Sequence, residues 1–190
     1  FPYTTLFRSL FDGYNKDELS SNIKFMIKNQ EYTEILESGD TGVILTEITP
    51  FYSEMGGQVG DKGLIIGENF KAQVTDCRKN VSGKIVHAVK IIEGIAKTGD
   101  IITLKVNEER KSNIRRNHTA THMLNAALRE VLGQQVHQAG SFVDDERLRF
   151  DFNHFEAVKP EELKKIEKIV NNNIIMAQNV DTQVMQLEER

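Results

Sequence analysis

The segment "RRNHTATHMLNAALREVLG", Arg115 to Gly133, carries the clearest structural signal in this chain. Its apolar residues recur at the i, i+3, i+4, i+7 spacing of an amphipathic helix, which we expect over residues 116–132. These residues are Ala120, Met123, Leu124, Ala127, Leu128 and Val131. Gly133 is expected to end the helix, because glycine tolerates the positive φ that follows many helices. The helical pattern begins at about Asn107, so the second half of the chain is expected to be rich in helix.

The sequence from residue 31 to residue 106 has a different pattern, in which runs rich in Val, Ile and Thr are separated by Gly, Asp and Asn turns. Six short strands are expected here. They are Glu31–Leu36, Gly42–Thr49, Gly63–Ile66, Lys71–Arg78, Ile85–Val89 and Ile101–Val106. Short strands with tight turns and little helix are typical of a small β-barrel or sandwich.

The residues before these strands predict a short helix from Leu10 to about Asn29. Two acidic residues lie near its start and Lys28 lies near its end, an arrangement that favours the helix dipole. The first nine residues, "FPYTTLFRS", resemble the translation of a sequencing-adapter oligonucleotide. We therefore expect residues 1–9 to be an artefact and residues 10–106 to form a β domain.

The part after the long helix predicts two strands and a second helix. The strands are expected at Arg147–Phe152 and, with a weaker pattern, at Val180–Leu187. The helix should begin at Pro160, since proline in the first turn costs no hydrogen bond. Its apolar positions are Leu163, Ile166, Val170, Ile174 and Ala177. Residues 107–190 should therefore form an α+β domain.

The composition excludes several classes of protein. The chain has 190 residues and 39% hydrophobic content, which is enough to bury a core. With 27% charged residues and a net charge of −4, it is neither a typical disordered chain nor a protein that coats nucleic acid non-specifically. Its single cysteine, Cys77, permits no internal disulfide, and no apolar run approaches the roughly 20 residues of a membrane span. We expect a cytoplasmic protein that binds neither membrane nor DNA.

His118 and His122 form a candidate metal site. Four residues apart on one helix, their β-carbons lie about 6 Å apart, which allows two imidazoles to reach one Zn²⁺. Thr119 replaces the glutamate of the metalloprotease HExxH motif. A zinc site needs three or four ligands, and no spacing recommends the remaining candidates. Those candidates are His87, His137, His154 and Cys77. By spacing alone, two surface histidines remain the alternative.

Two further segments combine glycine with polar residues. "TPFYSEMGGQVGD" (Thr49–Asp61) contains Gly56 and Gly57, which allow close approach of the backbone or a positive φ. This pattern fits a structural turn and a ligand-contacting loop equally well. "VHQAGSFV" (Val136–Val143) is expected to be a loop that places Gln138 beside a bend at Gly140.

Four segments together carry a family resemblance. "TPFYSEMGGQVGD", "RRNHTATHMLNAALREVLG", "HQAGSFV" and "LRFDF" occur in the order and at the spacing found in the middle of the alanyl-tRNA synthetase family. The similarity covers about Phe11 to Arg190. It implies an α+β architecture: a small N-terminal β-barrel followed by an editing domain of the type shared with threonyl-tRNA synthetase and the free-standing AlaX proteins. The chain resembles an internal fragment whose editing domain is incomplete at its C-terminal end.

The resemblance also implies an activity. Members of the family attach alanine to tRNA(Ala) with ATP, and their editing domain hydrolyses tRNA(Ala) mischarged with serine or glycine. Editing is needed because a pocket for alanine cannot strongly reject smaller glycine, or serine with one added hydroxyl. ATP would serve the parent enzyme only. We expect this fragment to be inactive in isolation.

The family motif assigns roles to individual residues. It holds Zn²⁺ with HxxxH and a later CxxxH; His118 and His122 match the first part, and the remaining ligands are expected beyond the C-terminus of this chain. Gln138 is implied as the catalytic-pocket residue that positions substrate or water, with Gly56 and Gly57 on a loop facing the same cleft. Three basic residues are candidates for phosphate contacts at the acceptor end of tRNA(Ala), or else form a solvated basic face. They are Arg115, Arg116 and Arg129.

Two alternatives remain open from the sequence. One is a free-standing AlaX-type hydrolase, which shares the barrel and both histidines but has no ligase part. The other is a non-catalytic RNA-binding module whose histidines bind nothing.

Overall fold

The structure is a computed structural model that describes residues 9–177 and 179. The chain divides into two compact units. The first, called here the barrel unit, comprises the residues up to His118 together with Ser141–Arg149. The second, called the helical unit, comprises Thr119–Gly140 together with the residues from Phe150 onward. Each unit is described by itself.

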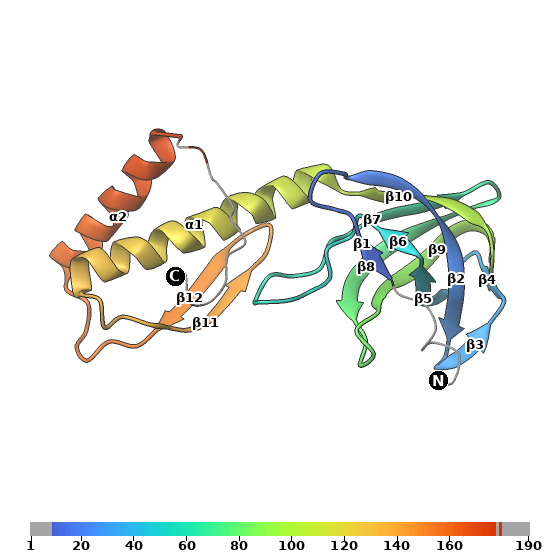
Figure 1. Ribbon diagram of the computed structural model, residues 1–190, viewed down its shortest axis with the longest axis horizontal. Helices are drawn as coiled ribbons and strands as arrows, with labels where there is room; N and C mark the ends of the chain where they lie inside the picture. The colour runs from blue at the N-terminus through green and yellow to red at the C-terminus, as the bar shows by residue number, and fades with distance from the viewer. Residues whose placement is uncertain (1–8, 178, 180–190) are drawn as a thin grey trace. The chain divides into compact units, whose positions relative to one another are not determined.

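A closed, antiparallel β-barrel forms the centre of the barrel unit (Figure 1). Its six strands are β2 (Glu18–Lys28), β5 (Thr41–Thr46), β7 (Gly63–Gly67), β8 (Phe70–Lys79), β9 (Ile85–Lys97) and β10 (Ile101–Val106). Neighbours follow the order β10-β7-β8-β9-β5-β2, and pairing of β2 with β10 closes the ring. The predicted small barrel is confirmed.

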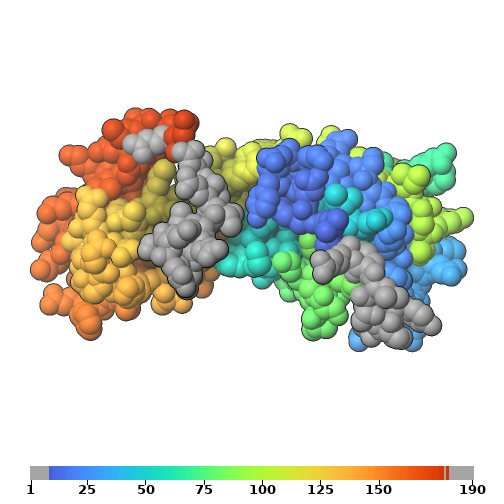
Figure 2. Space-filling model, viewed as in Figure 1, coloured from blue at the N-terminus to red at the C-terminus, as the bar shows by residue number. Residues whose placement is uncertain are grey.

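Four short strands lie around the barrel. β3 (Glu31–Thr33) pairs with β2, and β4 (Ile35–Glu37) pairs with β9. β1 (Leu10–Phe11) pairs in parallel with β6 (Ile48–Thr49). On the face drawn in Figure 2, the blue N-terminal residues of this unit accordingly lie beside cyan ones.

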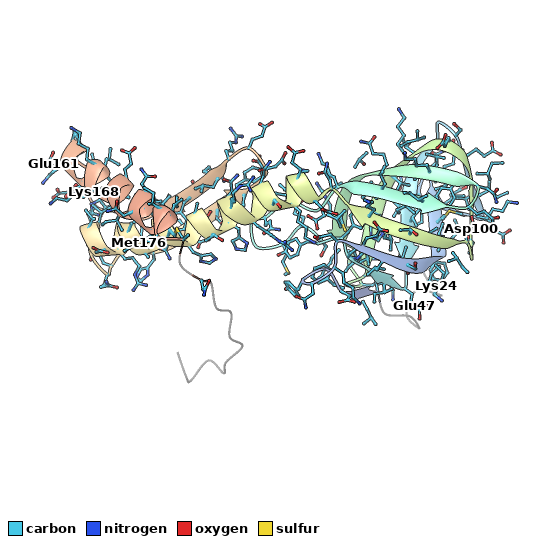
Figure 3. The ribbon with its side chains drawn as sticks, turned by 90° about the horizontal axis from the view of Figure 1, so that it is seen from above. Lys24, Glu47, Asp100, Glu161, Lys168 and Met176 are labelled. Carbon is cyan, nitrogen blue, oxygen red and sulfur yellow. The ribbon has the colours of Figure 1, made fainter. Side chains whose placement is uncertain are left out.

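Alternation of side chains along the strands builds the barrel core. In β10, for example, Ile102, Leu104 and Val106 are buried while the residues between them are not. One continuous cluster results, made of Ile23, Met26, Leu36, Ile44, Phe51, Ile65, Phe70, Ala72, Val74, Cys77, Ile85, Val89, Ile91, Ala96, Ile102, Leu104 and Val106. The outer surface carries ion pairs such as Lys24–Glu47, at 3.0 Å between Nζ and Oε2 (Figure 3).

The helix predicted from Leu10 to Asn29 is wrong, because this segment contains β1 and β2. Ile23 and Met26 are both buried although they are three residues apart, a spacing that imitates a helix. The register of β2 against β5 shifts between Ile23 and Phe25, and this irregularity turns both side chains into the core. Pairing with three other strands then outweighs the weak helical signal.

Other strand boundaries differ in detail. The strand predicted at Glu31–Leu36 is divided into β3 and β4, and the one at Gly42–Thr49 into β5 and β6. β9 continues to Lys97 instead of ending at Val89, since its later residues Ile91 and Ala96 also enter the core. β10 has the predicted bounds.

Helix α1 (Glu108–Leu132) contains the predicted segment and begins eight residues before residue 116. Asn107 is the N-cap of this helix, because its Oδ1 accepts the Arg110 N–H at 3.0 Å. Gly133 follows the last helical residue with φ of 111°, as expected. The helical unit also contains α2 (Pro160–Ile175), from which Glu161 and Lys168 project (Figure 3). The predicted start of α2 at Pro160 is confirmed.

The hairpin of β11 (Gln138–Val143) and β12 (Leu148–Phe152) follows α1. The loop predicted at Val136–Val143 is therefore mostly strand, because the residues from Gln138 onward pair with β12. The core of the helical unit is small, with Ala127, Leu128, Val136 and Ile166 buried. Four of the six predicted apolar positions of α1 belong to this core, namely Leu124, Ala127, Leu128 and Val131.

Two predictions for the C-terminal part have different outcomes. α2 ends at Ile175, and Ala177 lies beyond it with φ of 46°, so the helical stripe does not extend to Ala177. The predicted strand Val180–Leu187 lies outside the described residues. Within the described part of the chain, neither helix is long and apolar enough to cross a membrane.

Candidate functional site

The glycine-rich loop, Thr49–Asp61, is fixed to the barrel at both ends. At its start, Thr49 Oγ1 accepts the Phe51 N–H at 3.1 Å and lies 2.8 Å from His87 Nε2. At its end, Asp61 Oδ2 accepts the Tyr52 N–H at 2.9 Å. Burial raises the pKa of the Asp61 carboxyl, although the Tyr52 N–H and nearby cations act in the opposite direction. The loop is thus a well-anchored segment with an ordered backbone path.

The two adjacent glycines bring this loop onto strand β11. Gly56 and Gly57 have φ of 64° and 85°, a region that side chains rarely adopt. A Cβ on Gly57 would collide with the Ser141 carbonyl oxygen. The Val143 N–H donates to the Gly57 carbonyl at 2.8 Å, and the Val59 N–H donates to the Val143 carbonyl at 3.1 Å. The loop therefore adds a short parallel pairing to β11, the strand that begins at Gln138.

Two side chains of α1 hold the turn that follows β11, and no sequence motif indicates either of them. Arg110 Nε lies 2.9 Å from Asp145 Oδ1, and its Nη1 donates to the Gly60 carbonyl at 2.9 Å. Asn117 Nδ2 donates to the Asp144 carbonyl at 2.9 Å. These residues are seven apart and thus share one side of the helix. Their partners lie far away in the sequence, so only the fold reveals them.

A buried lysine anchors the start of α1. Lys111 Nζ donates to the Gly13 carbonyl at 2.9 Å and lies 2.8 Å from Asp17 Oδ1. Asp61 Oδ2 is 3.7 Å from the same nitrogen. Because a buried ammonium needs opposite charges and acceptors, this cluster keeps the glycine-rich loop and the helix start together.

His118 and His122 lie on α1 as predicted, and both are exposed. Two imidazoles fall short of the three or four ligands that zinc requires. Within residues 9–177 and 179, no group of three His, Cys, Asp or Glu side chains is placed to hold a metal ion. Their role as zinc ligands stays a prediction.

Two of the other metal-ligand candidates serve the barrel core. Cys77 and His87 are opposite each other on β8 and β9, and both are buried. His87 Nδ1 lies 3.0 Å from the Ile44 carbonyl, and Cys77 Sγ donates to the Phe51 carbonyl. Burial lowers the pKa of His87 to about 4 and raises the pKa of the Cys77 thiol well above its ordinary value. These contacts assign both side chains to packing.

Four further residues of the predicted site are exposed. Gln138 begins β11, and Arg129 lies in the last turn of α1. Arg115 Nη2 is 4.0 Å from Asp17 Oδ1, and Arg116 donates to Asn113 Oδ1. Their exposure leaves all four accessible to a large ligand, but their roles stay predictions.

A surface cavity of about 510 Å³ lies on the barrel unit, and Arg110 is one of the residues that line it. Lys62, Leu64, Gln73, Lys105 and Glu108 are among the residues that line it. Neither histidine of α1 nor Gln138 belongs to its lining. The cavity therefore does not coincide with the predicted site.

Comparison with known proteins identifies the family. The sequence model of the class II (A) tRNA synthetases matches residues 3–110, which is more than half of the chain. The chain belongs to the class II (A) tRNA synthetase family. Of the four segments that carry the resemblance, Thr49–Asp61 lies within the matched residues.

Two relatives of this synthetase chain are alanine–tRNA ligases. The one from Carboxydothermus hydrogenoformans is 52% identical over 165 residues, which are 87% of this chain and 19% of that protein. The one from Acetivibrio thermocellus is 43% identical over 179 residues, which are 94% of this chain and 20% of that protein. The chain thus spans about a fifth of the length of these curated relatives.

Proposed function

We propose that this region belongs to the proofreading module of an alanine–tRNA ligase, which hydrolyses tRNA(Ala) mischarged with serine or glycine. The parent enzyme would attach alanine to tRNA(Ala) with ATP. The two ligase relatives support this proposal, since they cover most of the chain. The observation that carries the editing role is the pairing of the glycine-rich loop with β11, the strand of Gln138.

The pairing supports a binding role because it brings unobstructed backbone to a strand that bears a polar side chain. Gly56 is exposed, and a Cβ built on it meets no atom within 4 Å. A ligand could thus approach the backbone closely at this position. Gln138 offers an amide that both donates and accepts hydrogen bonds. Such a combination suits recognition of an amino acid esterified to ribose.

The reaction would be hydrolysis of an ester. Water attacks the carbonyl carbon of the aminoacyl group, the bond from that carbon to the ribose oxygen breaks, and the released ribose hydroxyl takes up a proton. Gln138 would orient the substrate or the water through its amide, which contributes by positioning rather than by proton transfer. His118 and His122 would provide two of the ligands of a zinc ion, whose chemistry would be to orient substrate or polarise water.

The tRNA partner would contact α1 through its basic side chains. Arg115, Arg116 and Arg129 are exposed, as phosphate contacts require. Guanidinium groups bind phosphate oxygens with two parallel hydrogen bonds, which would align the acceptor end. We place the module in the cytoplasm, where a ligase would meet its tRNA.

A chimera tests this function. This chain replaces the matching 165 residues of the Carboxydothermus hydrogenoformans ligase, and alanine attachment to tRNA(Ala) serves as the control for folding. We expect the chimera to hydrolyse Ser-tRNA(Ala) and Gly-tRNA(Ala) while sparing Ala-tRNA(Ala), with the unaltered ligase measured in parallel. A chimera that attaches alanine but leaves both mischarged tRNAs intact, where the unaltered ligase hydrolyses them, would refute the editing role of this chain.

A further inference from the structure

The pairing between the glycine-rich loop and β11 is short. It consists of two backbone hydrogen bonds, Val143 N to Gly57 O and Val59 N to Val143 O, and a 3.5 Å contact from Ser141 Oγ to Gly56 O. A typical hydrogen bond contributes only about 1 kcal/mol net. Two strands paired over so few residues therefore need another contact to keep one register.

Arg110 supplies a contact to both paired segments. Gly60, whose carbonyl accepts from Nη1, comes directly after Val59. Asp145, which lies 2.9 Å from Nε, is two residues after Val143. One planar guanidinium thus reaches the loop and the hairpin turn immediately beside the residues that pair. The Arg110 side chain is only 12% exposed, so this ion pair is less screened by water than a surface pair.

The start of α1 fixes the guanidinium itself. The Arg110 N–H is held by Asn107 Oδ1, and the next residue, Lys111, is buried among Gly13, Asp17 and Asp61. The backbone that carries Arg110 is therefore anchored by contacts other than those of the Arg110 guanidinium. An anchored backbone of this kind allows one side chain to set the positions of the loop and of the hairpin turn.

We propose that Arg110 is a positioning residue that holds the glycine-rich loop in register with β11. Its planar fork contacts the Gly60 carbonyl and the Asp145 carboxylate at once, which a lysine ammonium on a flexible stem cannot reproduce. The consequence for substrate recognition rests on the proposed editing function, because the register fixes where Gly56 lies against Ser141 and Val143. The register itself does not depend on that function.

Hydrogen exchange of this chain measures the register directly. In Arg110→Ala, the Val59 and Val143 amides should exchange about tenfold faster, the ratio expected when a contact of ordinary strength is lost. The Leu104 amide in the barrel core should keep its rate. Arg110→Lys should exchange nearly as fast as Arg110→Ala at both sites. Unchanged exchange rates at Val59 and Val143 would overturn the proposal. Equal acceleration at Leu104 would also overturn it, because it would indicate general destabilisation of the barrel.

Two further variants make the result specific. Asp145→Ala removes only one of the two Arg110 contacts and should accelerate Val59 and Val143 by about threefold, a partial loss of the same interaction. Lys28→Ala is the matched control, because it removes an ion pair with Asp40 at 2.7 Å elsewhere on the barrel unit. It should leave both amides unchanged. If Lys28→Ala accelerates them as much as Arg110→Ala, the proposal is wrong.

Measurements on the chimera distinguish a failure of the register role of Arg110 from a failure of the editing function. In the chimera, Arg110→Ala should lower kcat/KM for Ser-tRNA(Ala) hydrolysis and leave alanine attachment unchanged. Faster exchange in a chimera that never hydrolyses mischarged tRNA would sustain the register role and refute editing. Normal exchange in Arg110→Ala would refute the register role even if the chimera edits.

Discussion

The two units of this chain differ in how they are stabilised. Among the described residues, seventeen buried side chains form the barrel core, whereas four are buried in the core of the helical unit. The barrel closes on itself and has no free edge between β2 and β10, while α2 leaves Leu163, Ile174 and Ile175 exposed. Most of the buried apolar side chains among the described residues therefore belong to the barrel unit. The barrel unit contains the glycine-rich loop and the hairpin turn. Gln138 belongs to the helical unit, which has the smaller core.

Removing one leucine from each unit should give the largest contrast. Leu104 is fully buried in the barrel, and Leu104→Ala should lower the free energy of unfolding by about 4 kcal/mol, because it loses burial and leaves a cavity. Leu163 in α2 is 53% exposed, so Leu163→Ala should cost less than about 1 kcal/mol. Urea denaturation of both variants measures the difference. Equal losses would contradict the assignment of the main core to the barrel.

Acid should weaken the barrel through His87. Burial holds its folded-state pKa at about 4, below the ordinary 6.5. Between these values the unfolded chain binds a proton that the folded chain does not, so stability falls as the pH decreases from 6.5 to 4. The shift corresponds to about 3 kcal/mol, at 1.36 kcal/mol per pKa unit. Urea denaturation at pH 7, 5.5 and 4 tests this expectation.

The control for this pH dependence is His87→Gln, which cannot take up a proton. Its stability should fall less between pH 7 and pH 4, with the difference from the parent chain isolating His87 from the carboxylates that also titrate. Parallel pH curves for the two chains would show that His87 is not the group responsible.

Two glycines with similar backbone angles allow the loop contact to be isolated. Gly39 has φ of 91° and open space where a Cβ would lie, whereas Gly57 has φ of 85° and the Ser141 carbonyl in that place. Gly39→Ala should cost about 1 kcal/mol from the backbone conformation alone. Gly57→Ala should cost about 2 kcal/mol, since it must also displace β11. Thermal denaturation measures both, and equal effects would argue against a close approach of the loop to β11.

The smallest expected effect concerns Cys77. Its thiol is fully buried and its pKa is raised by burial, so the reactive thiolate is scarce. A disulfide reagent such as DTNB should label Cys77 slowly in the folded chain and within seconds in urea. Rapid labelling without denaturant would indicate that the barrel opens more readily than its core suggests.

Most of the barrel could be predicted from the sequence because its strands alternate and are separated by turn residues. β2 could not, since the register shift near Lys24 places Ile23 and Met26 on one side at a helix-like spacing. The glycine pair and Gln138 were found as motifs, but no pattern indicated that their segments pair. Arg110 and Asn117 were missed because their partners, Gly60, Asp145 and Asp144, are 27 to 50 residues away in the chain.

The role of Gln138 is the central claim of the proposed function. Its most direct test is the rate of Ser-tRNA(Ala) hydrolysis by the chimera carrying Gln138→Ala, with Gln135→Ala as the matched control. Gln135 is also exposed, but its amide donates to the Leu132 carbonyl at the end of α1. We expect Gln138→Ala to lose about tenfold or more in rate, the effect of losing a positioning contact, while Gln135→Ala keeps the parent rate. Equal rates for the two variants would contradict the assignment of Gln138 to the editing pocket.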